Sequence, residues 1–171
     1  MPRKTRYGGH TMLLVMCLMA MTACVAASAQ DAHPHAHASA GAAVAQMTLD
    51  QGRKWATDAP LRAGVAAIQE AFETDHSGIH AGTETDKQYE ALAGRVESEV
   101  NTIVANCHLA PAADANLHYV IADLLQGASV MRGTVPGSVR HDGAALVHGA
   151  LLAYAAHFDD PHWSDGQPVN H

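Results

Sequence analysis

The stretch from residue 103 to residue 125 constrains the fold of this 171-residue chain more than any other part of it. It reads IVANCHLAPAADANLHYVIADLL, so that one helical pattern ends, Pro111 follows, and a second helical pattern begins. Proline suits the first turn of a helix, because the N–H that it lacks would have no partner inside the helix there. The stretch therefore predicts two helices joined by a tight corner, with Cys107 just before the corner and His118 just after it.

Apolar residues recur at helical spacing in four segments of the chain. The stripes are Leu61, Val65, Ile68, Phe72 and Ile79; Tyr89, Leu92, Val96, Val100, Ile103 and Cys107; Leu117, Val120, Ile121, Leu124, Ala128 and Met131; and Val147, Leu151, Tyr154 and Phe158. Helices are expected to begin near Asp58, Thr85 and Pro111 and after Ser138, with breaks at 80–82 and 133–138. An alanine-rich composition with only 5% aromatic residues also favours helices. These features predict an all-α, antiparallel up-down-up-down four-helix bundle over 58–160, followed by a C-terminal tail at 161–171.

The position of Cys107 within its stripe predicts its environment. It follows Tyr89 by eighteen residues, which is five whole turns of an α-helix. Cys107 should therefore point along the middle of the apolar face. A buried core thiol is the first expectation for such a cysteine.

The N-terminus has the pattern of an export signal. Arg3, Lys4 and Arg6 precede a short apolar run, and Ala27-Ser28-Ala29 has the small residues of a cleavage site, which predicts a signal peptide over 1–29. The run is too short to be expected to span a membrane. Met21-Thr22-Ala23-Cys24 approximates a bacterial lipobox, so lipidation of Cys24 is an alternative. Either way a periplasmic location is expected, and Cys107 is the one cysteine left after the leader.

Residues 30–57 are expected to form a flexible, His-containing linker, because residues 30–50 are small, polar and without helical or strand period. His33, His35 and His37 form an H-x-H-x-H array within it. Several imidazoles close together can take up Cu(II), Ni(II) or Zn(II) without a fold. The alternative is a solvated spacer. Trp55 is expected to lie against the end of the bundle.

Charge excludes one class of partner. The formal net charge is −7, and removal of the three basic residues of the leader leaves 7 basic residues against 17 acidic ones, a net charge of −10. Nucleic-acid binding needs a basic face, so it is not expected. Thirteen histidines are many for this length.

The predicted topology brings cysteine and histidine side chains together at the two ends of the bundle. One end collects Cys107, His118 and His157, and the other collects His76, His80 and His141. A thiolate with two imidazoles is a competent copper or zinc site, so the Cys107 end is the predicted metal centre.

Other functions remain open from the sequence. One is a structural or adaptor domain without a ligand, acting with a periplasmic protein partner. Another is a b-type haem bound by His157 with Met47 or His118. No residue pattern supports catalysis, so no enzymatic activity is expected.

Three segments carry a resemblance to a known group of proteins. They are KWATDAPLRAGV at 54–65, IVANCHLAPAADANLHYVIADLLQGA at 103–128 and LLAYAAHFDDPHW at 151–163. Together they resemble small exported proteobacterial proteins labelled DnrO-like. The positions that match the group's central motif are Asn106, Cys107, Leu109, Pro111, Asp114, Leu117 and His118. The group's closing motif FDHPGW is here Phe158-Asp159-Asp160-Pro161-His162-Trp163, with the histidine displaced. The resemblance implies an exported helical domain and no particular activity.

Overall fold

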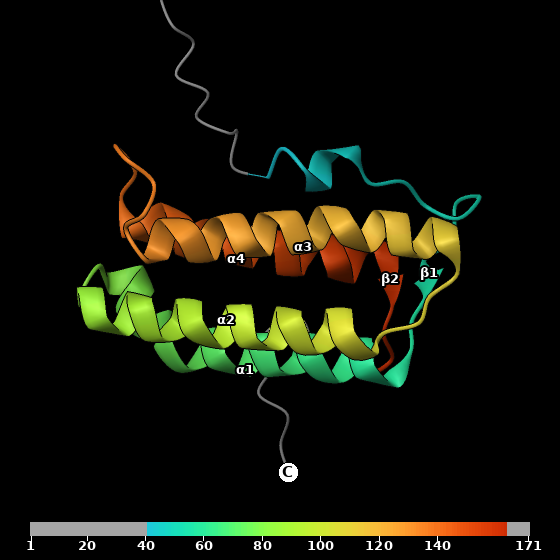
Figure 1. Ribbon diagram of the computed structural model, residues 1–171, viewed down its shortest axis with the longest axis horizontal. Coiled ribbons are helices and arrows are strands. Elements are labelled where there is room, and N and C mark those ends of the chain that lie inside the picture. Colours follow the sequence, from blue (N-terminus) through green and yellow to red (C-terminus); the bar gives the residue numbers. More distant parts are fainter. Residues whose placement is uncertain (1–40, 164–171) are drawn as a thin grey trace, which may run out of the picture. The chain divides into compact units, whose positions relative to one another are not determined.

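A computed structural model of the protein describes residues 41–163 and confirms the helical bundle. Its four helices are α1 (Ala59–Ala81), α2 (Asp86–Asn106), α3 (Pro111–Met131) and α4 (Arg140–His157). They pack in sequential order, with α3 and α4 forming one layer and α1 and α2 the other (Figure 1). A 3-10 turn, η1 (Val44–Gln46), precedes the bundle, and two short strands, β1 (Trp55–Ala56) and β2 (Phe158–Asp159), flank it in sequence.

The predicted start and stop signals act as expected. Asp58 caps α1 by accepting a hydrogen bond from the Leu61 N–H at 2.9 Å, and Pro60 lies in the first turn. Thr85 and Gln88 form a capping box at the start of α2. Gly82 ends α1 with φ at 65°, a left-handed conformation that costs glycine little. Sequence-local chemistry thus sets the helix boundaries.

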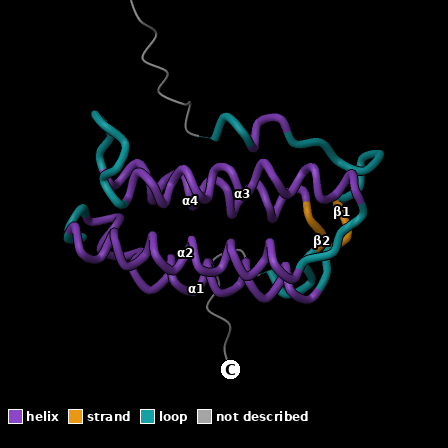
Figure 2. The backbone as a smooth tube through the Cα atoms, in the orientation of Figure 1, coloured by secondary structure: helices purple, strands orange, loops and turns teal. Residues whose placement is uncertain are grey.

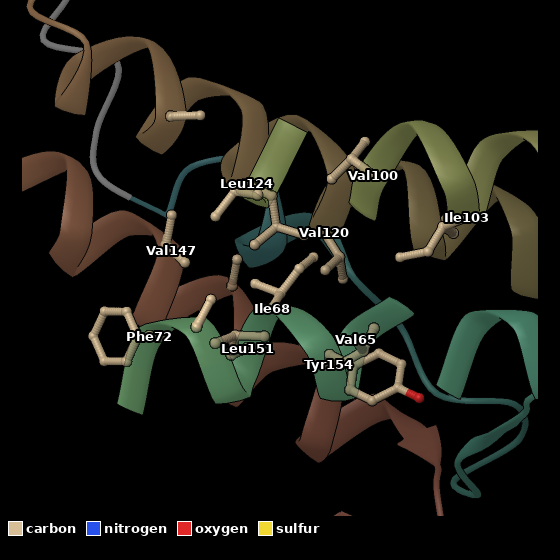
Figure 3. Close-up of a cluster of buried hydrophobic side chains, with 14 of the residues drawn as sticks. Val65, Ile68, Phe72, Val100, Ile103, Val120, Leu124, Val147, Leu151 and Tyr154 are labelled. Carbon is tan, nitrogen blue, oxygen red and sulfur yellow. The ribbon is translucent and has the colours of Figure 1, made fainter. Parts of the chain in front are cut away.

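The core runs along the length of the bundle and is filled by the predicted stripes. Figure 3 shows side chains from all four helices meeting there, with Phe72 and Tyr154 toward opposite ends of the cluster. The fully buried members include Leu61, Ile68, Leu92, Ile103, Leu124 and Tyr154. Successive helices pack closely, whereas α1 and α4 touch only sparsely. One long side of the bundle is therefore less tightly closed than the others.

The segment over 41–57 is packed on the bundle, which corrects the expectation of a flexible linker for this part of the chain. The Asp123 carboxylate accepts a hydrogen bond from the Val44 N–H at 3.1 Å. The Asn116 side-chain oxygen accepts one from the Thr48 N–H at 2.8 Å. Met47 is buried between these two anchors. We call residues 44–57 the strap; it runs along α3 (Figure 1).

The strap ends in a parallel pairing that the sequence did not predict. β1 pairs with β2, with Trp55 opposite Phe158 and Ala56 opposite Asp159. Figure 2 shows these strands at one end of the helices. Trp55 is half-buried against the core, so its predicted place at the end of the bundle is confirmed. Two-residue strands about a hundred residues apart leave too little periodicity to be recognised in a sequence.

Several sequence predictions fall outside the described residues. The expected leader, the alternative lipidation site Cys24 and the array of His33, His35 and His37 lie in 1–40, and the end of the tail lies in 164–171. Among residues 41–163, no helix is both long enough and apolar enough to cross a membrane.

Candidate functional site

The predicted metal centre lies where α2 meets α3, and its cysteine is less buried than expected. The helix ends at Asn106, and Cys107 adopts an extended conformation with ψ at 137°. This departure from helical geometry turns the residue away from the middle of the apolar face. Cys107 is consequently half-buried and only packs against the core.

The groups that act on the Cys107 thiol are acidic. Burial, together with the negative charge and hydrogen bonding of Asp58 and the charge of Asp114, raises the pKa of the thiol from 9.0 to about 11. Asp58 itself is an anchor of this corner. Besides capping α1, its carboxylate accepts a hydrogen bond from the His108 N–H at 2.6 Å. Cys107 is therefore held as a protonated thiol beside a carboxylate, which makes it a poor nucleophile.

The two histidines predicted to join Cys107 are bonded within their own helices. His118 is exposed, and its Nδ1 lies 2.8 Å from the Asp114 backbone oxygen. His157 is half-buried, and its Nδ1 lies 2.8 Å from the Ala153 backbone oxygen. Within residues 41–163, no three His, Cys, Asp or Glu side chains are arranged to hold a metal ion. The structure thus does not assemble Cys107, His118 and His157 into the predicted centre.

The other side chains at this end of the bundle form hydrogen bonds and aromatic contacts around Tyr154. Tyr154 is buried and donates a hydrogen bond from its hydroxyl to the Asp160 carboxylate at 2.9 Å. Burial and Asp160 raise the Tyr154 pKa well above its usual range. The tyrosine ring stacks on Phe158, with centroids 5.2 Å apart, and meets Trp163 at 5.8 Å. These contacts fasten the end of α4 and explain why the conspicuous aromatic residues gather there.

The opposite end of the bundle holds a groove that is rich in imidazole. A pocket of about 170 Å³ opens between α1 and α4. Four of its wall residues are histidines and three are apolar: His76, His80, His141, His148, Phe72, Ile79 and Ala145. We call it the histidine groove. All four histidines are exposed, so their ring nitrogens can be reached from solvent.

Ring contacts link the two helices across the histidine groove. His76 and His80 lie one turn apart on α1, with ring centroids 6.2 Å apart. Phe72 lies one turn before His76, at 6.0 Å. The Phe72 ring also stacks on His148 of α4 at 5.2 Å, with 18° between the ring planes. Phe72 therefore contacts one imidazole from each of the two helices.

A sequence signal for this groove exists, although the metal site predicted from the sequence lay at the other end. His76 and His80 are spaced H-x-x-x-H, which places two imidazoles on one face of a helix, as in helical zinc motifs. His141 and His148 are seven residues, about two turns, apart on α4, so spacing alone predicts that they share a face of that helix. Only tertiary packing shows that this face meets Phe72 of α1.

The histidine groove offers imidazole nitrogens to an ion and aromatic faces to a small ring. No protein-family model matches the chain, and no curated protein or solved structure matches it either. The chemistry of the described residues therefore has to indicate the function.

Proposed function

We propose that this protein is exported and binds a divalent transition-metal ion, copper before zinc, through histidine imidazoles, without catalysing a reaction. The observation that supports this most is the histidine groove, with His76 and His80 as a pair of exposed imidazoles one helical turn apart. Imidazole nitrogen suits copper, nickel and zinc, and copper(II) binds a given nitrogen site more tightly than zinc does. The groove replaces the Cys107 end as the folded part of the proposed site.

The helix that carries the pair favours a cation. His80 lies in the last turn of α1 and His76 one turn earlier. The carbonyl groups at the C-terminus of a helix give that end a partial negative charge, which stabilises positive charge nearby. An ion held by these two residues would sit in that field.

The size of the histidine groove also favours an ion over an organic ligand. Its volume is about 170 Å³, below the roughly 300–1,000 Å³ of pockets that bury drug-sized molecules. A b-type haem is therefore the least supported of the alternatives. A red preparation with a Soret absorbance band would bring it back.

The arm with His33, His35 and His37 gives a second place for the same chemistry. Its H-x-H-x-H pattern needs no fold to take up an ion, so it could bind one independently of the folded site. The rival function, an adaptor domain without a ligand, is favoured by one finding. No three potential ligands converge within the described part of the chain.

Calorimetric titration of the mature chain with Cu(II) and Zn(II) tests the proposal. Three variants are compared with the wild type: the arm variant, with His33, His35 and His37 changed to Ala; the groove variant, with His76→Ala and His80→Ala; and the combination of both. We expect the arm variant to bind one ion and the combined variant to bind none with comparable affinity. His76 and His80 are exposed, so we expect their replacement to leave folding unaffected.

Two results would overturn the proposal. If the wild type binds neither ion more tightly than the combined variant does, the protein is not an ion-binding protein. If the arm variant and the combined variant behave alike, the fold makes no contribution, and the histidine groove has to be abandoned.

A further inference from the structure

The histidine pair of α1 leaves a bound ion with only part of its ligands. His76 and His80 are both exposed, and their ring centroids lie 6.2 Å apart with 24° between the ring planes. Two imidazoles fill two of the four positions of a tetrahedral zinc ion. Among residues 41–163, no three His, Cys, Asp or Glu side chains are placed to hold an ion, so the same domain does not complete the set. Further protein ligands therefore have to come from another molecule.

The surface beside the histidine pair can receive another molecule. We call the exposed residues Ala145, His148, Gly149, Leu152 and Ala156 the α4 face, and the first two of them also line the histidine groove. Leu152 is 55% exposed, and no atom lies within 4 Å of the Cβ position of Gly149. The segment 143–158 contains no Asp, Glu, Lys or Arg. An uncharged face with small residues around an exposed leucine thus continues from the groove, and a second helix can approach it closely.

A second copy of this chain fits both features. Without the predicted leader the chain has a net charge of −10, and α1 and α2 carry exposed carboxylates such as those of Glu70, Glu73 and Glu90. Two such copies repel each other, so they are expected to meet where one face is uncharged and a cation lies at the contact. A two-fold contact uses the same patch on both molecules. Each copy then brings one histidine pair, and the two pairs supply the four nitrogens of a tetrahedral site.

We infer that one divalent ion joins two copies of the protein, held by His76 and His80 of each copy, with the α4 faces packed beside it. The inference rests on the proposed function and adds to it the partner and the complete ligand set. Two copies share an ion when the ion is scarce. When the ion is in excess, each pair takes an ion of its own and the dimer separates.

Sedimentation velocity with Zn(II) as the probe tests the inference, with the arm variant as the background so that the arm cannot compete. We expect a monomer without the ion. With half an equivalent of Zn(II) per chain we expect a dimer that holds one ion per two chains, and excess Zn(II) should return it to monomers. The groove variant should stay monomeric. His118→Ala is its control, because it removes an exposed histidine at the other end of the bundle and should dimerise like the background.

A second pair of variants tests the α4 face. Leu152→Glu places two like charges close to each other across the two-fold contact, so we expect it to bind Zn(II) but to weaken the dimer at least about tenfold. The matched control is Leu125→Glu, which changes an exposed leucine of α3 and should leave the dimer unchanged. Circular dichroism of each variant checks that the helices are intact.

The outcomes separate the inference from the function on which it rests. If the background protein binds Zn(II) but stays monomeric at half an equivalent, water completes the coordination and the inference is wrong, while ion binding stands. If the groove variant dimerises with Zn(II) as the background does, the histidine pair does not hold the shared ion. If Leu152→Glu and Leu125→Glu behave alike, the α4 face is not in the contact. If the background protein binds no Zn(II) at all, the proposed function of the folded domain fails.

Discussion

At the scale of single residues, burial and the neighbouring carboxylates lower the reactivity of the Cys107 thiol. Its pKa is raised from 9.0 to about 11, so at pH 8 the thiolate fraction is about a hundredfold smaller than that of an ordinary cysteine. A more basic thiolate is also more nucleophilic, which offsets about half of that factor on a logarithmic scale. We expect alkylation by iodoacetamide to be about tenfold slower in the folded protein than in urea. Equal rates would show that the thiol is neither shielded nor perturbed.

Asp58 should make the stability of the fold depend on acid pH. Burial opposes its ionisation, but hydrogen bonds from the His108 and Leu61 N–H groups and from Cys107 outweigh this and lower its pKa below 3.8. A carboxyl whose pKa is lower in the folded than in the unfolded state stabilises the fold fully above the unfolded value. That stability is lost as the pH falls through the lower, folded value.

The measurement is the urea midpoint of unfolding between pH 2.5 and pH 7 for the wild type and Asp58→Asn. Asparagine still caps the helix but cannot ionise, and it accepts at one oxygen where the carboxylate uses two. We expect Asp58→Asn to be less stable at pH 7 and the difference to shrink below about pH 4. A difference that does not change with pH would contradict the assigned role of the charge.

At the scale of helices, the contact between α3 and α4 depends on two glycines. A Cβ atom on Gly127 would lie 2.7 Å from the Gly143 backbone oxygen and 2.8 Å from a Val147 methyl carbon. We expect Gly127→Ala to cost about 1–3 kcal/mol in the free energy of unfolding, as overpacking typically does. Gly149, also in α4, has open space around its Cβ position. Gly149→Ala should therefore stabilise the protein by roughly 0.5–1 kcal/mol. If both substitutions change the free energy of unfolding in the same direction, as measured by urea unfolding, α3 and α4 do not pack as closely at Gly127 as described.

The strap depends on the buried carboxylate of Asp123. Its side chain is 6% exposed, and it accepts the Val44 N–H. A hydrogen bond to a charged group contributes about 1.5–3 kcal/mol, so Asp123→Ala should increase local opening of the strap about tenfold to a hundredfold. Trypsin cleavage after Arg53 or Lys54 reports this opening. Asp123→Asn keeps an acceptor and should be cleaved more slowly than Asp123→Ala. Unchanged cleavage of both variants would show that Asp123 does not hold the strap.

The elements differ in how far the sequence predicts them. Helix limits follow from local chemistry, as with the Asp58 cap and Pro111, and the prediction placed them correctly. Cys107 was misplaced because a helical register was continued one residue past Asn106, where the chain turns extended. The strap was missed because its polar, low-complexity sequence gains its order from Asp123 and Asn116, which lie more than sixty residues away.

The histidine groove shows the same limit for a candidate site. The i,i+4 pair of His76 and His80 is readable within one helix, and the sequence placed both, with His141, at the end opposite Cys107. His148 of α4 was not linked to this pair, because it contacts Phe72 of α1 and no spacing along the chain encodes a contact between two helices. Ligands drawn from different helices become visible only once the packing of those helices is known.

At the scale of the whole molecule, an ion held in the histidine groove should stabilise the entire bundle. A ligand that binds only the folded state adds about 2.7 kcal/mol at a free concentration of 100 Kd. For a domain of this size that corresponds to a rise of about 5–10 °C in Tm. Histidines of the unfolded chain also bind ions weakly, so the lower end of this range is expected. The wild type and the arm variant should both show the shift with Zn(II), which avoids redox side reactions. With the groove variant the shift should be lost, because the ion then has no histidine pair of the folded domain to bind. If Zn(II) binds the wild type without raising its Tm, the ion is held by the arm and the bundle does not use it.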